Sequence, residues 1–239
     1  RVSWQKHLKM ELQEAHENAQ LKLVEFSDEL KKQIPKTLFE SVKIHYRMLK
    51  GTPQNVISDA SERYKPDIIL MGVLENIKRS GGFLEKTIVK VIEQSNCPVL
   101  AVPGLTTLKV KNKINVMYAT NFYEADNSSL NKLLYILQPF EKEIHCVHVS
   151  LHKNPHYKEK EVELNELMAK DYGEHNIQCE LLESENINKG FNDFVVKNSI
   201  DIISFSKMKR SAFYKMFHQS LLQKLISGGA EIPVLIFPV

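Results

Sequence analysis

The cysteines and histidines of this sequence do not follow the spacing of known catalytic or metal-binding motifs. The three cysteines, Cys97, Cys146 and Cys179, are widely spaced and contain no CxxC pair, so neither a disulfide framework nor a zinc site is expected. Buried free thiols in a reducing cytoplasm fit this pattern better. The nine histidines contain no HExxH motif, and we expect structural roles for His145 and His148. We therefore predict no metal site and no catalytic residue.

Charge patterning gives no sign of a nucleic-acid partner. The net charge of +3 comes from 32 basic and 29 acidic residues. The basic clusters at 109–113 and 207–210 are short, and we expect them to be solvated linker and loop surface. No apolar run approaches the ~20 residues of a membrane span, and no secretory signal begins the chain. These features predict a cytoplasmic protein that binds neither nucleic acid nor membrane.

The chain contains one segment twice, at 66–103 and at 200–238. Asp201 follows Asp67 by 134 residues and Ser206 follows Gly72 by the same interval, while Pro233 follows Pro98 by 135. A period this long is far beyond that of a solenoid unit, so each copy should belong to its own domain.

Each copy has the pattern strand, helix, strand. DIIL and DIIS begin apolar runs without polar alternation, which is typical of strands buried on both faces of a parallel sheet. Polar turns follow at 74–82 and 207–211. Apolar residues at helical spacing then predict helices over 83–92 and 213–225, before the apolar strands PVLAV and PVLIF. Such a crossover unit is nearly always parallel and right-handed.

The remaining elements complete the second half and only part of the first. A long amphipathic helix is predicted over 4–33, ended by Pro35, then a strand at 42–49 and a helix near 56–64. In the second half we expect strands at 114–120, 144–149 and 177–182. Helices are expected at 128–137, 158–175 and 190–198. The predicted domains are 1–104 and 113–239, with a linker at 105–112. The first domain lacks a strand–helix–strand of about 40 residues, without which its sheet would keep an open central edge.

The motifs DIILMG, VIEQSNCPVLAVP, ATNF, KRSAFYKMFHQSL and IPVLIFP resemble the universal stress protein family, and the whole chain is similar to a tandem member. The resemblance implies an α/β fold with two doubly wound parallel sheets of the adenine nucleotide α-hydrolase type. It implies strand order 3-2-1-4-5 in each domain. It also implies a pseudo-twofold relation in which the last strands of the two domains pair within the chain.

The family's ATP-binding members carry G-x-x-G, nine residues, then G-S/T after the fourth strand, where backbone amides approach the phosphates. This chain departs from that pattern in both halves. In the first, Gly72 is kept, but the later positions hold Glu75 and Glu85-Lys86. In the second, they hold Ser206, Lys209 and Gln219-Ser220. Asn121 matches the family's adenine-contacting carboxylate. By this resemblance the candidate nucleotide-binding residues are Gly72, Asn121, Ser206, Arg210, Ser211 and Ser220.

Three functions remain open at this point. The first is a non-catalytic stress-response binding or regulatory module with degenerate nucleotide-binding loops, unknown protein partners and no cofactor. The second is a universal stress protein that binds ATP or AMP with weak or no hydrolysis. The third, an unrelated enzyme on the same sheet, has no paired carboxylates, triad or metal set to support it, and a fold alone does not imply an activity. A homodimer also remains open.

Overall fold

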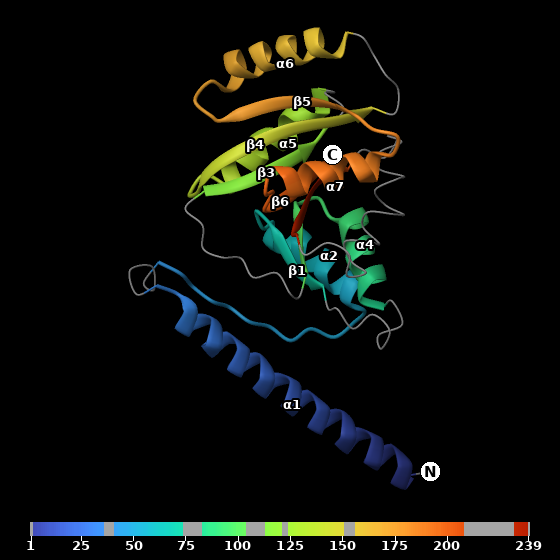
Figure 1. Ribbon diagram of the computed structural model, residues 1–239. Coiled ribbons are helices and arrows are strands. Elements are labelled where there is room, and N and C mark those ends of the chain that lie inside the picture. Colours follow the sequence, from blue (N-terminus) through green and yellow to red (C-terminus); the bar gives the residue numbers. More distant parts are fainter. Residues whose placement is uncertain are drawn as a thin grey trace. The chain divides into compact units, whose positions relative to one another are not determined.

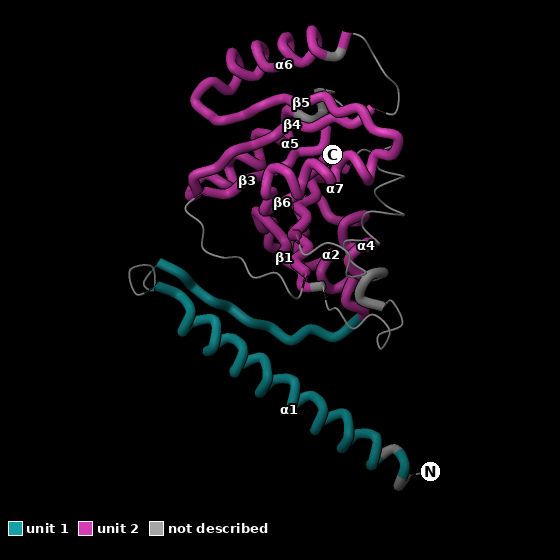
Figure 2. Tube along the Cα trace, viewed as in Figure 1, with its two compact units in different colours: residues 1–51 teal, residues 52–239 magenta. Residues whose placement is uncertain are grey.

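A computed structural model describes residues 2–35, 41–73, 83–103, 113–120, 124–150, 156–207 and 232–238. The chain divides into two compact units, Arg1–Gly51 and Thr52–Val239 (Figure 2). The predicted linker at 105–112 and the predicted helix at 213–225 lie outside the described residues.

The first unit consists mainly of one helix, α1 (Val2–Gln33). Its extent confirms the helix predicted from apolar spacing, and it stops two residues before Pro35, which disfavours helical geometry in the residue before it. The prediction of a strand at 42–49 is wrong, because residues 42–50 have no regular secondary structure. Alternating β-branched residues give only a weak preference. A strand also needs a neighbour for its backbone groups, and none of the described strands pairs with this segment.

The second unit alternates helices and strands (Figure 1). Its first copy of the repeat contains β1 (Ile69–Val73), α4 (Phe83–Gln94) and β2 (Val99–Pro103), preceded by α2 (Pro53–Tyr64). The remaining elements are β3 (Lys113–Ala119), α5 (Glu124–Ile136), β4 (Glu141–Ser150), α6 (Tyr157–Tyr172), β5 (Ile177–Glu183), α7 (Ile187–Lys197), β6 (Ile202–Lys207) and β7 (Val234–Pro238). These positions match the predicted elements apart from shifts at their ends.

One seven-stranded sheet runs through this unit in the order β1-β2-β7-β6-β3-β4-β5. Neighbouring strands are parallel except at one seam, where β2 and β7 are antiparallel with Val99 opposite Ile236. The predicted pairing of PVLAV with PVLIF is therefore confirmed. The fold is α/β, with a predominantly parallel central sheet.

Backbone geometry repeats in the two copies. The Ile69 amide donates to the Pro98 carbonyl at 2.8 Å, and the Ile203 amide donates to the Pro233 carbonyl at 3.0 Å. Just before each copy, one residue adopts a left-handed conformation, Lys65 with φ 44° and Ser199 with φ 50°. Each of these residues follows a helix and turns the chain into the next strand.

The sheet is covered on both faces by helices. On one face, α4 and α7 contribute Ile88, Val91, Phe191 and Phe194 to a core shared with alternate strand residues. On the other, α5 and α6 contribute a second core. Because successive strand residues point to opposite faces, Met117 lies in the first core and Tyr118 in the second.

Candidate functional site

The carboxyl ends of the neighbouring parallel strands β3 and β6 lie side by side, and the chain leaves these two strands toward opposite sides of the sheet. From β3 the chain continues to β4 on one side, whereas β6 lies on the other side and leads to β7. In open α/β sheets, ligands bind in the crevice at such a switch point. The described residues at this edge include Thr120, His148, Ser206 and Lys207, which makes it the candidate site.

The hydroxyl of Ser206, a predicted site residue, is already bonded within the protein. Its Oγ lies 2.5 Å from the hydroxyl oxygen of Tyr118. Tyr118 is a fully buried residue of β3, and the two strands are paired in parallel register with Tyr118 opposite Ser204. A ligand oxygen that used Ser206 would have to replace this internal hydrogen bond, which lowers the net gain from binding.

His148 joins the ends of β3 and β4. Its Nδ1 lies 3.0 Å from the Thr120 carbonyl oxygen, and the Thr120 amide donates to the Val147 carbonyl at 3.0 Å. Burial lowers the pKa of His148, and the Lys160 charge lowers it further, against the hydrogen bond to Thr120. A neutral imidazole at this contact carries its proton on Nδ1, because the carbonyl can only accept.

Lys207 binds a helix of the other repeat copy. Its Nζ donates to the Ile92 carbonyl at 2.9 Å and also to the Glu93 carbonyl. Both carbonyls lie in the last turn of α4, where backbone acceptors lack intrahelical partners and a cation is favoured by the helix dipole. Lys207 is 6% exposed. The prediction that the 207–210 cluster is solvated surface is therefore wrong for Lys207.

Gly72 lies on β1, at one edge of the sheet, and is exposed. A Cβ placed there would meet no described atom within 4 Å. In the described residues β1 pairs only with β2, so the structure gives Gly72 no second strand with which to form a crevice. Gly72 and Ser206 belong to strands separated by β2 and β7, and the sheet does not bring these two predicted residues together.

Four predicted site residues, Asn121, Arg210, Ser211 and Ser220, lie outside the described residues. Sequence reasoning missed Tyr118, Thr120 and Lys207. The position of Tyr118 and Thr120 at the end of a predicted strand could have indicated them, whereas nothing in the sequence indicated that Lys207 reaches α4.

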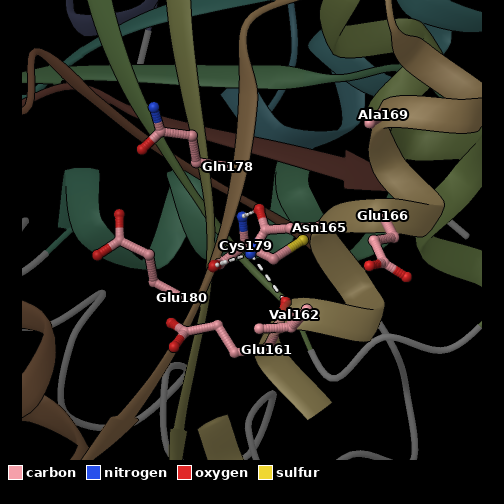
Figure 3. Close-up of a pocket in the computed structure, with 8 residues that line it drawn as sticks. All are labelled: Glu161, Val162, Asn165, Glu166, Ala169, Gln178, Cys179 and Glu180. Atoms are coloured by element: carbon pink, nitrogen blue, oxygen red, sulfur yellow. Dashed lines mark hydrogen bonds between the residues drawn. The ribbon is translucent and has the colours of Figure 1, made fainter. Parts of the chain in front are cut away.

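A groove of about 580 Å³ lies beside β5, the outer strand at the other end of the sheet from β1, between β5 and α6 (Figure 3). Glu161 and Glu166 of α6 and Cys179 and Glu180 of β5 line it, and the Glu180 carboxylate points away from α6 and lies 2.8 Å from His145 Nδ1. The Asn165 side chain donates to the Cys179 carbonyl at 2.9 Å and accepts from the Cys179 amide at 2.8 Å. The Glu161 carboxylate accepts from the Leu181 amide at 3.1 Å. These contacts satisfy the outer backbone groups of β5.

Other chemistry finds little support in the part of the chain that the structure describes. No cluster of three or more metal-ligating side chains occurs among those residues. The three cysteines are buried, as predicted, and none of them forms a disulfide. None of the described helices is long and apolar enough to cross a lipid bilayer.

Comparison with known proteins gives a family match for part of the chain. Residues 3–103 match the Universal stress protein family. A universal stress protein of Methanocaldococcus jannaschii is 37% identical over 81 residues, which are 34% of this chain and 48% of that relative. The chain therefore spans about half the length of this curated relative.

Solved structures share the fold. A universal stress protein from Archaeoglobus fulgidus aligns with a TM-score of 0.67 and 16% identity, covering 95% of this chain and 78% of that one. A functionally unknown protein from Pseudomonas aeruginosa aligns with a TM-score of 0.60 and 12% identity, covering 92% and 77%. Residues 3–103 of the chain therefore match the universal stress protein family, and the chain has the fold of a solved universal stress protein.

Proposed function

We propose that the chain is a tandem universal stress protein that acts as a non-catalytic, cytoplasmic binding or regulatory module in a stress response. Its domains are 1–104 and 113–239, and its nucleotide-binding loops are degenerate. The observation that carries the proposal is the Ser206–Tyr118 hydrogen bond, which occupies the predicted site hydroxyl at the switch point of the sheet.

Two features support the tandem arrangement. Counted from β3, the second-half strands lie in the order β5-β4-β3-β6-β7, which corresponds to 3-2-1-4-5. The paired hydrogen bonds of Ile69 and Ile203, and the left-handed residues Lys65 and Ser199, recur at one interval. Segments with the same backbone turns at the same spacing are expected of two related domains.

The polar and charged side chains at the expected phosphate-binding positions support degenerate nucleotide-binding loops. Lys207, the residue after Ser206, directs its ammonium to α4 and away from a phosphate role. In the first half, Glu75 and Glu85 occupy positions where ATP-binding members have glycine. A carboxylate close to a phosphate oxygen costs about 1 kcal/mol even in a water-like dielectric.

A thermal-melt series of the purified chain with Mg-ATP, ADP and AMP tests the proposal. We expect no shift in Tm with any of the three nucleotides. A ligand at 100 times its Kd would add about 2.7 kcal/mol to the folded state, a rise on the order of 5–10 °C. Such a rise, lost in Ser220→Ala, would replace the proposal with the ATP-binding alternative.

A restoration variant sharpens the test. The triple change Ser206→Gly, Lys209→Gly and Gln219→Gly rebuilds the G-x-x-G, nine-residue, G-S pattern of the second half. The same three positions changed to alanine serve as the matched control. If loop degeneracy prevents binding, the glycine variant should gain a Tm shift with ATP that the alanine variant lacks. Flat melts for both would contradict the degenerate-loop explanation.

A further inference from the structure

Cys146 and Cys179 are brought together by the sheet although they lie 33 positions apart in the sequence. They are register partners on the parallel strands β4 and β5, and both lie in the same core cluster. Paired residues of neighbouring strands lie about 4.8 Å apart and point to the same face. A disulfide requires a Cα–Cα separation of about 4.4–6.8 Å, so the backbone already meets this requirement.

The two cysteines are equally buried, each 2% exposed, but they differ in their distance from a groove. Cys179 lines the groove between α6 and β5, on a strand that pairs with β4 alone in the described sheet. Cys146 lies on the inner neighbour, β4, and does not line the groove. A small molecule in the groove therefore lies nearer to Cys179 than to Cys146, and a local opening of the α6–β5 contact would expose the Cys179 sulfur.

The neighbouring Cys146 makes the Cys179 thiol easier to deprotonate. A hydrogen bond from Cys146 lowers the pKa of the Cys179 thiol, whereas burial and the charges of Glu161 and Glu180 raise it. The thiolate is the reactive form of cysteine. The carboxylates of Glu161 and Glu166 on the α6 side of the groove repel anionic reagents, so an uncharged oxidant is favoured.

We propose that Cys146 and Cys179 form a reversible, peroxide-responsive thiol pair that closes to a cross-strand disulfide. This inference does not depend on the proposed function. The Cys179 thiolate attacks one oxygen of hydrogen peroxide, an S–O bond forms, the O–O bond breaks, and the released hydroxide takes a proton to become water. Cys146 sulfur then attacks the Cys179 sulfenic acid, the S–S bond forms, the S–O bond breaks, and hydroxide leaves with the Cys146 proton as a second water. In total, two thiols lose two electrons and one peroxide becomes two waters.

Thiol counting on the intact chain tests the pair. The chain is treated with hydrogen peroxide, denatured and labelled with a maleimide. We expect the number of free thiols to fall from three to one, with a mass loss of two hydrogens and full recovery after dithiothreitol. Tryptic peptides 143–153 and 171–189 should appear cross-linked in the oxidised wild-type chain. Three remaining thiols, or cross-links only between chains, would overturn the proposal.

Single variants separate the roles of the two sulfurs. Cys97→Ser is the matched control and should still lose both remaining thiols. Cys146→Ser should stop at a dimedone-reactive sulfenic acid on Cys179, whereas Cys179→Ser should keep both thiols. Oxidised glutathione, which is anionic, should react at least tenfold more slowly than peroxide. Equal rates would contradict selection by the acidic groove. The wild-type peptide map decides the main point even if a variant does not fold.

Discussion

The two copies of the repeated segment have similar sequences but different neighbours. In the second copy, β6 lies between β7 and β3, and the Asp201 carboxylate accepts a hydrogen bond from the Asn115 amide of β3 at 3.0 Å. In the first copy, β1 has β2 on one side only within the described residues, and the matching residue Asp67 is exposed. The same local pattern thus produces a central strand in one place and an edge strand in the other.

The two edges of the sheet differ in a related way. At β5, side chains of α6 satisfy the outer backbone groups, with Asn165 on Cys179 and Glu161 on Leu181. At β1, Leu70 is 67% exposed. Open apolar edge strands are sites where other chains can pair. The amino-acid sequence of a strand therefore does not by itself determine how exposed that strand is in the sheet.

The largest effect is expected at the seam between the copies. Val99 is 1% exposed and lies opposite Ile236, so Val99→Lys would bury a charge without a partner. We expect a loss of about 4 kcal/mol or more in the free energy of unfolding, measured by urea denaturation. Leu70→Lys, at the open edge, should change it by no more than about 0.5 kcal/mol. Equal losses would contradict the assignment of seam and edge.

Asp67 and Asp201 occupy equivalent positions in the two copies, so substitutions of these residues compare the copies directly. Asp201→Ala leaves the Asn115 amide without its charged acceptor, and we expect a loss of about 2–3 kcal/mol. Asp67→Ala should stay within about 0.5 kcal/mol. Chemical denaturation of both variants measures the difference. A comparable loss for Asp67→Ala would mean that β1 has an unrecognised neighbour.

One substitution should remove the side-chain hydrogen bonds that cover the outer side of β5. Asn165→Ala removes both side-chain hydrogen bonds to Cys179, with an expected cost of about 1–2 kcal/mol. Native-state hydrogen exchange should show faster exchange of the Cys179 amide, approaching that of outward-facing amides on β1. The exposed groove residue Glu166, changed to alanine, serves as the control. Unchanged exchange in Asn165→Ala would mean that other contacts protect β5.

The smallest effect is a pH dependence at the end of β4. Because the folded pKa of His148 is lowered from 6.5, the unfolded chain takes up this proton first as the pH falls. Its contribution to stability is therefore complete above 6.5 and is lost as the pH falls toward the folded pKa. We expect His148→Gln to reduce this acid-side loss by about 1 kcal/mol or less, measured by denaturation between pH 5 and 8. An acid-side loss in His148→Gln as large as that of the unsubstituted chain would contradict this role for His148.

Much of the fold could be predicted from local patterns. Continuous apolar runs identified the strands from β1 to β7, and helical spacing identified α1, α4 and α7, because these signals depend on side chains close in sequence. The family resemblance predicted the β2–β7 seam. The segment at 42–49 failed because alternation alone does not provide a pairing strand.

The candidate site was less predictable because its contacts join distant residues. Family resemblance indicated Ser206 but not its bond to Tyr118, which depends on the register of β6 with β3. The sequence by itself determined the elements, the repeat and the absence of a CxxC or HExxH motif. Only the tertiary structure decided that Lys207 is buried against α4 and that Cys146 faces Cys179. Strand order and register set such contacts, and they result from the packing of the whole sheet.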